Sequence, residues 1–190
     1  MRRLLLAAVA LFFVCVTARA QEEYPRLEVF GGYAYFNSDQ FRERESLNVP
    51  AFIVSAAGNV TKNFGVVAEV NGNYGDITDF TAPEMGLPTR EFATNVYTFL
   101  FGPRFTARGT GKNFFGHVLF GAARTNIEGR GSETNFAMAV GVGLDINASE
   151  QIAVRLFQAD YLPIFDSKFD PNTAHNYRIS VGIVFRFGAK

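Results

Sequence analysis

The sequence predicts an all-β fold, an eight-stranded antiparallel up-and-down transmembrane β-barrel. Three observations point to it: apolar and polar side chains alternate with a period of two, aromatic residues are abundant (21 Phe and 7 Tyr), and long connections alternate with short ones. Side chains alternate across a β-strand, so a period of two predicts strands. After residue 20 no run of 18 apolar residues occurs, so no helical span is predicted.

The strand predicted at 175–187 shows the pattern most clearly. From Tyr177 onwards every second side chain is apolar or aromatic, and the other face carries two arginines among small residues. This fits a strand with lipid on one side and a packed polar interior on the other. A soluble sandwich strand also alternates, so the aromatic finish and the repeats upstream decide between the two. The apolar face holds Tyr177, Ile179, Val181, Ile183, Phe185 and Phe187, and the other face holds Arg178, Ser180, Gly182, Val184 and Arg186.

The first four predicted strands set bulky apolar side chains against small or polar ones in the same way. A strand of about 11 residues, at about 3.3 Å per residue and a tilt of about 40°, rises roughly 30 Å. That height matches the hydrocarbon core of a bilayer. These strands are predicted at 26–36, 52–60, 64–74 and 95–106.

The next three predicted strands are less uniform. The first of them is irregular because Phe115 and Leu119 fall on the face of His117. The second is regular, with glycines and alanines opposite larger apolar residues. In the third the phase slips, which predicts a β-bulge near Leu156 and Phe157. Their ranges are 113–126, 135–146 and 151–162.

Long and short connections alternate strictly between these strands. About fifteen residues join the first two strands, about twenty the third and fourth, about eight the fifth and sixth, and about twelve the last two. Only three to six residues separate the remaining pairs. In a meander this puts all long loops at one end, as in outer-membrane barrels with short periplasmic turns. Closure is expected because an open edge would leave backbone groups unpaired in lipid.

The first 20 residues are predicted to be a signal peptide. Arg2 and Arg3 form a positive start, an apolar run follows, and Ala18-Arg19-Ala20 is a small-x-small cleavage site. The apolar run is too short for a helical anchor, which needs about 20 residues. The predicted domains are therefore the signal peptide, 1–20, with cleavage near Ala20, and the outer-membrane barrel, 21–190.

Charge and cysteine content exclude some partners and sites. The chain has 18 basic and 18 acidic residues; removal of Arg2, Arg3 and Arg19 with the signal peptide leaves 15 basic against 18 acidic. This mild negative balance argues against nucleic acid as a partner. The single cysteine, Cys15, lies in the signal peptide, so the remainder is predicted to have no disulfide and no thiolate site.

Several stretches carry a resemblance to a known family. They read Val29-Phe30-Gly31-Gly32-Tyr33, Asn59-Val60-Thr61-Lys62-Asn63-Phe64-Gly65, Phe99-Leu100-Phe101-Gly102-Pro103-Arg104 and Ala139-Val140-Gly141-Val142-Gly143-Leu144-Asp145, followed by the last strand. Together they resemble the OmpA-like outer-membrane β-barrel domain family, small eight-stranded porin-like barrels. The resemblance implies the cell outer membrane of Gram-negative type, with outer-membrane lipid and the barrel-insertion machinery as partners. That machinery reads an aromatic last residue in the family, whereas here three residues follow Phe187.

Seven charged residues are predicted to face the interior as a polar network, three acids against four bases. An eight-stranded barrel is just wide enough for side chains to fill it, so paired charges would neutralise one another and plug the lumen. A narrow gated pore whose charge pairs exchange partners is the alternative. Gly141 and Gly143 are predicted to make room for inward arginines. The network residues are Glu28, Glu69, Arg104, Asp145, Arg155, Arg178 and Arg186.

Outward aromatic residues near the strand ends are predicted to form girdles at the two membrane interfaces. The ordinary preference of Tyr and Phe for strands is the alternative explanation. The girdle residues are Tyr33, Tyr35, Tyr74, Tyr97, Tyr161, Tyr177, Phe185 and Phe187.

No catalytic, cofactor or metal site is predicted, and the chain is predicted not to be an enzyme. The two histidines, His117 and His175, stand in no Ser/His/acid pattern. The loop acids lack calcium-loop spacing, and two histidines do not favour a metal site. The GxG of Gly141 and Gly143 lies mid-strand, where no phosphate cradle is expected.

The leading functional prediction is an integral outer-membrane barrel with a structural or surface-interaction role, long extracellular loops and a charged, plugged lumen. The alternative is a narrow porin-like channel for small solutes or ions. A soluble lipocalin-like carrier would need apolar residues inside and polar ones outside, the opposite of the predicted polarity. No feature of the loops names an extracellular ligand.

Overall fold

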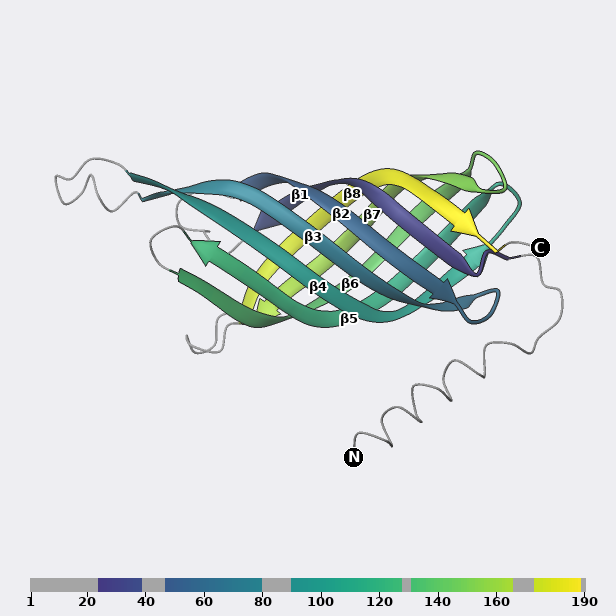
Figure 1. Ribbon diagram of the computed structural model, residues 1–190, viewed down its shortest axis with the longest axis horizontal. Coiled ribbons are helices and arrows are strands. Elements are labelled where there is room, and N and C mark those ends of the chain that lie inside the picture. Colours follow the sequence, from purple (N-terminus) through teal and green to yellow (C-terminus); the bar gives the residue numbers. More distant parts are fainter. Residues whose placement is uncertain (1–23, 39–46, 80–89, 128–130, 166–172, 189–190) are drawn as a thin grey trace, which may run out of the picture.

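The computed structural model describes residues 24–38, 47–79, 90–127, 131–165 and 173–188; the predicted signal peptide lies outside them. Within these ranges eight antiparallel strands form a closed barrel, in which β1 pairs with β8 (Figure 1). The predicted fold class is confirmed. No helix in the described part is long and apolar enough to cross a membrane. The strands are β1 (Leu27–Ser38), β2 (Leu47–Asn59), β3 (Phe64–Asp79), β4 (Arg90–Arg108), β5 (Lys112–Ile127), β6 (Gly131–Asn147), β7 (Ile152–Phe165) and β8 (Thr173–Phe187).

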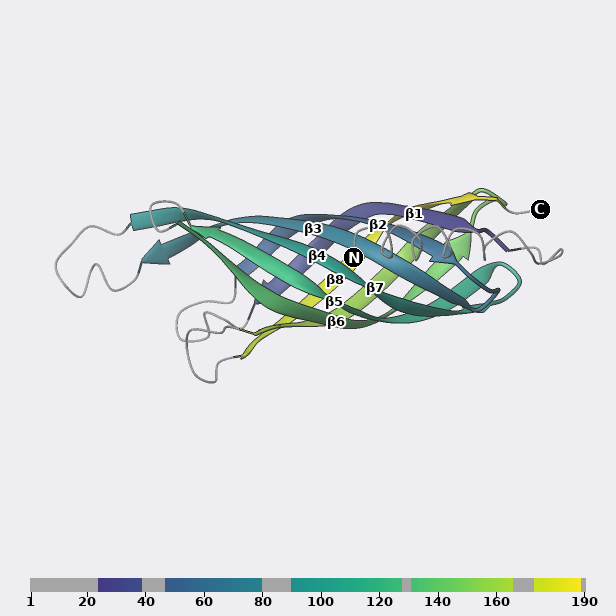
Figure 2. The ribbon, with the colours of Figure 1, turned by 60° about the horizontal axis from the view of Figure 1, so that its bottom comes forward.

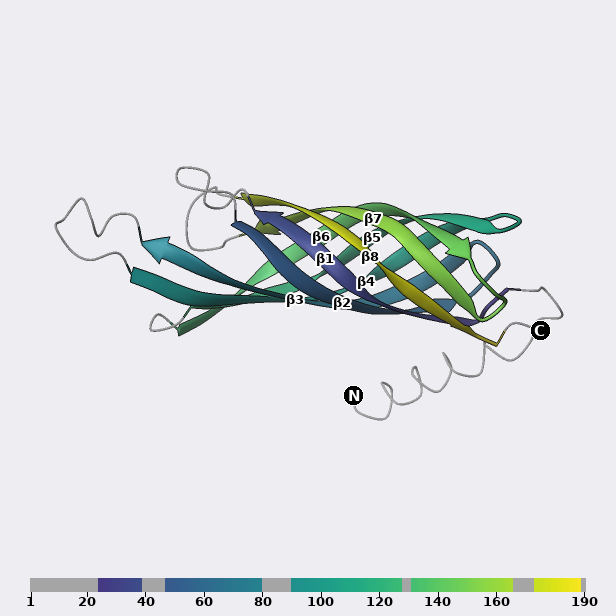
Figure 3. The same cartoon turned by 90° about the horizontal axis from the view of Figure 1, so that it is seen from above.

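The two ends of the barrel differ. The start of β1 and the end of β8 lie at the end that carries the short turns, which we call the inner end (Figure 1). In one of these turns the Gly109 N–H donates to the Lys112 carbonyl at 3.0 Å, and Gly111 has a φ of 84°, a conformation that glycine adopts readily. The strand ends that lead into the longer connections lie at the opposite, outer end. There β3 and β4 project beyond the other strands (Figures 2 and 3).

Most strands are longer than the sequence pattern predicts, chiefly at the outer end. β3 and β4 remain paired as far as Asp79 and Arg90, and β2 begins at Leu47 rather than at residue 52. The backbone hydrogen bonds of an antiparallel pair do not require apolar side chains. The backbone pairing therefore continues beyond the residues in which apolar and polar side chains alternate in the sequence.

The polarity of the barrel is the predicted one, with apolar side chains outside. Ile179, Val181 and Ile183 on β8 are 56%, 47% and 46% exposed, whereas Arg178 and Arg186 on the same strand are 1% and 6% exposed. The interior is not purely polar, because Phe115 and Leu119 of β5 are buried on the side of His117. The irregular alternation of that strand thus reflects apolar side chains that fill the lumen.

The predicted β-bulge in β7 is present. Leu144 of β6 pairs with Phe157, and the next residue, Asp145, pairs with Arg155, so Leu156 has no partner on β6. The register with β8 shifts over the same residues, between Arg155 and Gln158. Leu156 and Phe157 are both exposed on the outer surface. The extra residue therefore changes the phase of the strand, as a bulge does.

Two glycines face each other where the barrel closes. Gly32 of β1 pairs directly with Gly182 of β8, and the ring of Phe30 lies against both from the interior. A Cβ at Gly182 would lie 2.3 Å from the Gly31 carbonyl oxygen and 2.5 Å from the Gly32 Cα. The absence of side chains here lets the two strands approach closely with Phe30 packed over them.

We expect Gly182→Ala to destabilise the barrel, because the added methyl collides with backbone atoms of β1 that cannot turn away. Overpacking of this kind costs about 1–3 kcal/mol. The midpoint of urea unfolding, followed by far-UV circular dichroism in lipid vesicles, measures the loss. Gly31→Ala is the matched control, since nothing lies within 4 Å of a Cβ there. Equal midpoints for the two variants would contradict the close-packed seam.

Candidate functional site: the charged lumen

All seven residues of the predicted polar network lie inside the barrel, each at most 6% exposed. The structure divides them between two groups that meet at Arg155. The inner cluster lies near the inner end of the lumen and consists of Glu28, Arg104, Arg108, Asp145, Arg155 and Arg186. The middle cluster lies farther along the lumen and consists of Glu69, His117, Gln158, Asp160 and Arg178.

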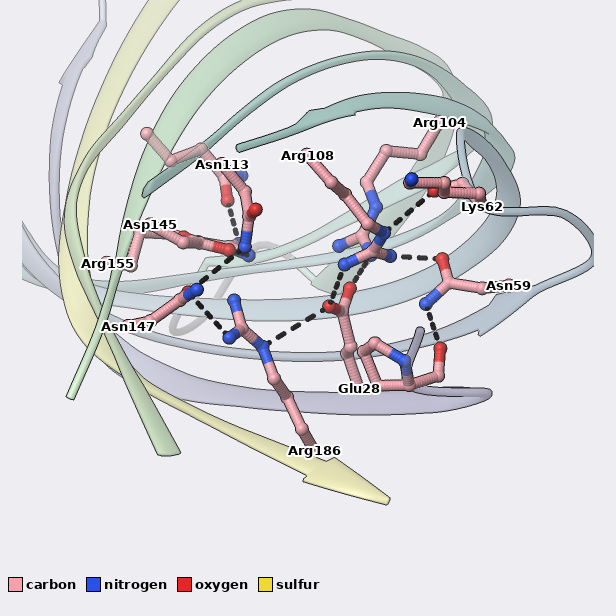
Figure 4. Close-up of polar contacts among 12 residues, drawn as sticks. Glu28, Asn59, Lys62, Arg104, Arg108, Asn113, Asp145, Asn147, Arg155 and Arg186 are labelled. Atoms are coloured by element: carbon pink, nitrogen blue, oxygen red, sulfur yellow. Dashed lines mark hydrogen bonds and ion pairs between the residues drawn. The ribbon is translucent and has the colours of Figure 1, made fainter. Parts of the chain in front are cut away.

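Glu28 on β1 is the centre of the inner cluster (Figure 4). Its carboxylate pairs with Arg104 of β4, with Arg108 Nη1 at 3.0 Å, and with Arg186 Nε of β8 at 3.5 Å. Polar neighbours hold these guanidinium groups further: Arg186 Nη1 donates to Asn147 Oδ1 at 2.6 Å, and Arg108 Nε donates to the Lys62 carbonyl at 2.7 Å. One carboxylate thus binds together strands from opposite parts of the wall.

Arg155 on β7 is held by a carboxylate and two aromatic rings. Its Nε and Nη2 donate to the two carboxylate oxygens of Asp145, at 2.8 and 3.2 Å. Its guanidinium carbon lies 4.1 Å from the centre of the Phe30 ring and 4.3 Å from that of Phe115. A guanidinium group is attracted to the faces of aromatic rings, more strongly where water is excluded. The apolar residues of the lumen therefore help to stabilise its charge.

Arg178 on β8 is the centre of the middle cluster and is fully buried. It pairs with Glu69 of β3 and donates to Asp160 Oδ2 of β7 from Nε at 2.9 Å and from Nη2 at 2.6 Å. The other oxygen of Asp160 lies 2.8 Å from His117 Nε2. Buried carboxylates need such partners, because an unpaired charge in the interior is very costly.

The side-chain amide of Gln158 joins the two clusters. Its oxygen accepts from Arg155 Nη1 at 2.6 Å. Its nitrogen donates to Asp160 Oδ2 at 2.9 Å and to Glu69 Oε2 at 3.2 Å. Because an amide both donates and accepts, it links a guanidinium group to two carboxylates without adding charge.

Four network residues were missing from the sequence-based set: Arg108, His117, Gln158 and Asp160. Arg108 lies beyond residue 106, where the fourth strand was predicted to end. The sequence did carry a signal for the other three. His117 falls on the inward face of its strand, and the bulge turns Gln158 and Asp160 inward together with Arg155.

Gly141 and Gly143 make room for other groups than the predicted arginines. A Cβ at Gly141 would lie 1.8 Å from Asp160 Oδ1 and 2.8 Å from His117 Nε2. A Cβ at Gly143 would lie 2.3 Å from the Phe115 ring. That prediction was wrong because facing strands bring the His117–Asp160 pair and an aromatic ring, rather than a guanidinium group, against this stretch of β6.

The predicted girdle residues all have side chains on the outer surface, but they are not evenly placed. Tyr74 and Tyr97 lie toward the outer end and share a hydrogen bond of 3.3 Å between their hydroxyl groups. Tyr161 and Tyr177 also pack together toward that end, with ring centres 5.5 Å apart. Phe185 and Phe187 lie toward the inner end, beside the start of β1. Tyr35 is exposed on β1, and Tyr33, the seventh of the twelve β1 residues, lies nearer the middle of the strand.

The described residues hold no group of three His, Cys, Asp or Glu side chains that could bind a metal ion. Of the two histidines, His117 contacts Asp160 inside the lumen, and His175 Nδ1 contacts the Tyr161 hydroxyl on the outer surface. What this arrangement does chemically is pair charges and hold them in place inside a closed wall.

Solved structures of outer-membrane proteins share this fold. Neisserial surface protein A (NspA) superposes with a TM-score of 0.65 at 11% identity, over 85% of this chain and 97% of that one. OprG of Pseudomonas aeruginosa gives 0.58 at 10% identity, over 88% and 98%. Ail of Yersinia pestis, in complex with the heparin analogue sucrose octasulfate, gives 0.54 at 17% identity, over 84% and 97%. Such low identities show a common fold only.

Sequence comparison supplies the family. No curated protein sequence matches the chain. Residues 6–187 match the family described as outer membrane protein beta-barrel domain, which confirms the resemblance drawn from the sequence. Because the match spans nearly the whole chain and the strands close as that family requires, the chain belongs to the outer membrane protein β-barrel domain family.

Proposed function

We propose that this outer-membrane barrel is a membrane anchor with a plugged lumen, which presents its outer end for surface interactions and has no enzymatic role. The observation that carries the proposal is the filling of the lumen by interlocked charged and apolar side chains. Arg178, Gln158, Ile53, Leu119 and Leu162 are fully buried, although they come from different parts of the wall. Residues that line an open aqueous channel would be accessible to solvent.

The outer surface suits lipid. Its exposed side chains include Phe99, Phe101, Val142 and Ile179, so apolar groups cover strands all around the wall. The paired tyrosines toward the outer end and Phe185 and Phe187 toward the inner end support an interfacial role for the girdle set. On this proposal, removal of the signal peptide 1–20 and the barrel-insertion machinery bring the chain into the membrane.

The outer end offers a rigid support for recognition. The β3–β4 hairpin continues as a paired ladder to Asp79 and Arg90, beyond the ends of the neighbouring strands (Figure 3). Loops on a rigid scaffold commonly carry binding. NspA is named a surface protein and Ail an attachment and invasion locus protein, which supports a surface role for this chain as well.

Purified protein in planar bilayers is expected to show no steady, large conductance, because side chains fill the lumen. The folded fraction of each preparation is measured alongside by heat-modifiable gel mobility, so that a lack of conductance from unfolded protein is not taken as evidence for a plugged lumen. Steady conductance that scales with the folded fraction would overturn the plugged lumen and favour the narrow channel.

Arg178→Met is expected to lower the free energy of unfolding by about 3–5 kcal/mol, because Glu69 and Asp160 would stay buried without their shared guanidinium partner. Urea unfolding in vesicles, followed by circular dichroism, measures the change. Arg124→Gln is the control: Arg124 is exposed on the outer surface, and its change should stay within about 0.5 kcal/mol.

The triple variant Glu69→Gln, Asp160→Asn, Arg178→Met separates charge from packing. It removes both uncompensated carboxylates and should recover part of the stability that Arg178→Met loses. If the triple variant is as unstable as the single one, the charge pairs are not the source of the effect.

An epitope inserted between Glu84 and Met85, in the connection from β3 to β4, is expected to bind antibody on intact cells, since the proposal places the outer end outside. The same epitope inserted after Gly109, in an inner-end turn, should bind only after permeabilisation. Labelling of the Gly109 insertion on intact cells would show that the barrel has the opposite orientation. Both insertions lie in connections, where added residues are best tolerated.

A further inference from the structure

Charge is unevenly distributed along the lumen. The inner cluster holds four guanidinium groups and two carboxylates, a surplus of two positive charges. The middle cluster holds one guanidinium group and two carboxylates. Gln158, which joins them, is neutral, so the surplus at the inner end is not cancelled by direct pairing.

The surplus of positive charge is concentrated around Glu28. Asp145 is occupied by the two-pronged contact with Arg155, which leaves Arg104, Arg108 and Arg186 to share one carboxylate. Like charges held this close in a region of low dielectric repel each other strongly. Asn59 and Asn147 accept hydrogen bonds from Arg104 and Arg186 but bring no negative charge.

Donors remain unused in this cluster. Arg104 Nε and Arg108 Nη2 are buried, and neither has an acceptor among the described residues. Arg186 Nε has only its 3.5 Å contact with Glu28, which is not aligned as a hydrogen bond. Buried charged donors without an acceptor cost more than neutral ones. The unused donors thus belong to the arginines that converge on Glu28 (Figure 4), where negative charge is in shortest supply.

Among the described residues, exposed charges near the entrance to the cluster are also mostly positive. Exposed Arg26, Lys62 and Lys112 lie at the inner end of the barrel, where Glu150 is the exposed acid of the third turn. The Arg108 side chain retains 9% exposure, more than those of Arg104 and Arg186, and is the member nearest to solvent. Such a field raises the local concentration of anions.

We propose that the inner cluster binds a small phosphate-class anion that enters from the inner end of the lumen and accepts hydrogen bonds from the unused donors of Arg104 and Arg108. A phosphate dianion matches the surplus of two charges. Its several oxygens suit guanidinium groups, which bind phosphate through parallel N–H donors. The source is either free inorganic phosphate or the phosphate of a lipid headgroup.

Isothermal titration calorimetry of the full barrel with inorganic phosphate tests the site, in a detergent without phosphorus and at constant ionic strength. Wild-type protein should bind phosphate and not chloride. Arg108→Gln should weaken binding at least tenfold, because it removes a free donor and one surplus charge while Glu28 keeps Arg104 and Arg186. Lys112→Gln, an exposed change of the same charge at the same end, should alter binding less than twofold.

A variant that is expected to strengthen phosphate binding distinguishes a specific effect on the site from misfolding. Glu28→Gln removes the competing carboxylate and should tighten phosphate binding severalfold, whereas a purely structural cluster would gain nothing. Heat-modifiable gel mobility verifies that each variant is folded. The proposal is overturned if wild-type protein binds no phosphate, if Arg108→Gln binds as wild type does, or if Lys112→Gln loses as much as Arg108→Gln.

The two sources are distinguished by repeating the titration in phosphatidylglycerol vesicles. Binding of inorganic phosphate both in detergent and in vesicles supports a site for free phosphate. Binding in detergent that disappears in vesicles supports occupation by a headgroup.

Discussion

Pairing of β1 with β8 is the constraint on which the rest of the structure depends. In hydrocarbon, each unpaired backbone group costs several kcal/mol, so a sheet can remain in a membrane only if its first and last strands meet. The Gly32–Gly182 pair allows that meeting, and the Phe30 ring covers it from the interior. Once the ladder closes, every side chain must point either to lipid or into a narrow lumen.

Two kinds of side chain fill the lumen under this constraint. Arg155 lies between the rings of Phe30 and Phe115 while it pairs with Asp145. Aliphatic residues such as Leu119 and Leu162 fill the space around the ion pairs. The apolar groups exclude water, which strengthens the attraction between charges, and the pairs in turn satisfy groups that could not stay buried alone.

The sequence was sufficient for the number of strands, the assignment of faces and the bulge in β7, because all three follow from a period of two and its interruptions. It was weaker where position depends on partners from other strands. Arg108 was missed because alternation of apolar and polar residues does not mark the last residues of β4. The role of Gly141 was misjudged because Asp160 and His117 reach it from β7 and β5. Which arginine meets which carboxylate is decided by shear and tilt of the whole barrel, which no local pattern records.

The bulge at Leu156 has a consequence for how this strand can change over time. Arg155 lies before it and Gln158 and Asp160 after it, and all three reach the interior only because the bulge lets two consecutive residues, Leu156 and Phe157, face outward. Loss of the codon for either of these two residues would leave a regular strand with the same polar residues inside. Regular alternation through both of them would instead send an amide and a carboxylate into hydrocarbon and bring Phe157 inward, so the strand tolerates one residue fewer here only if the bulge disappears with it.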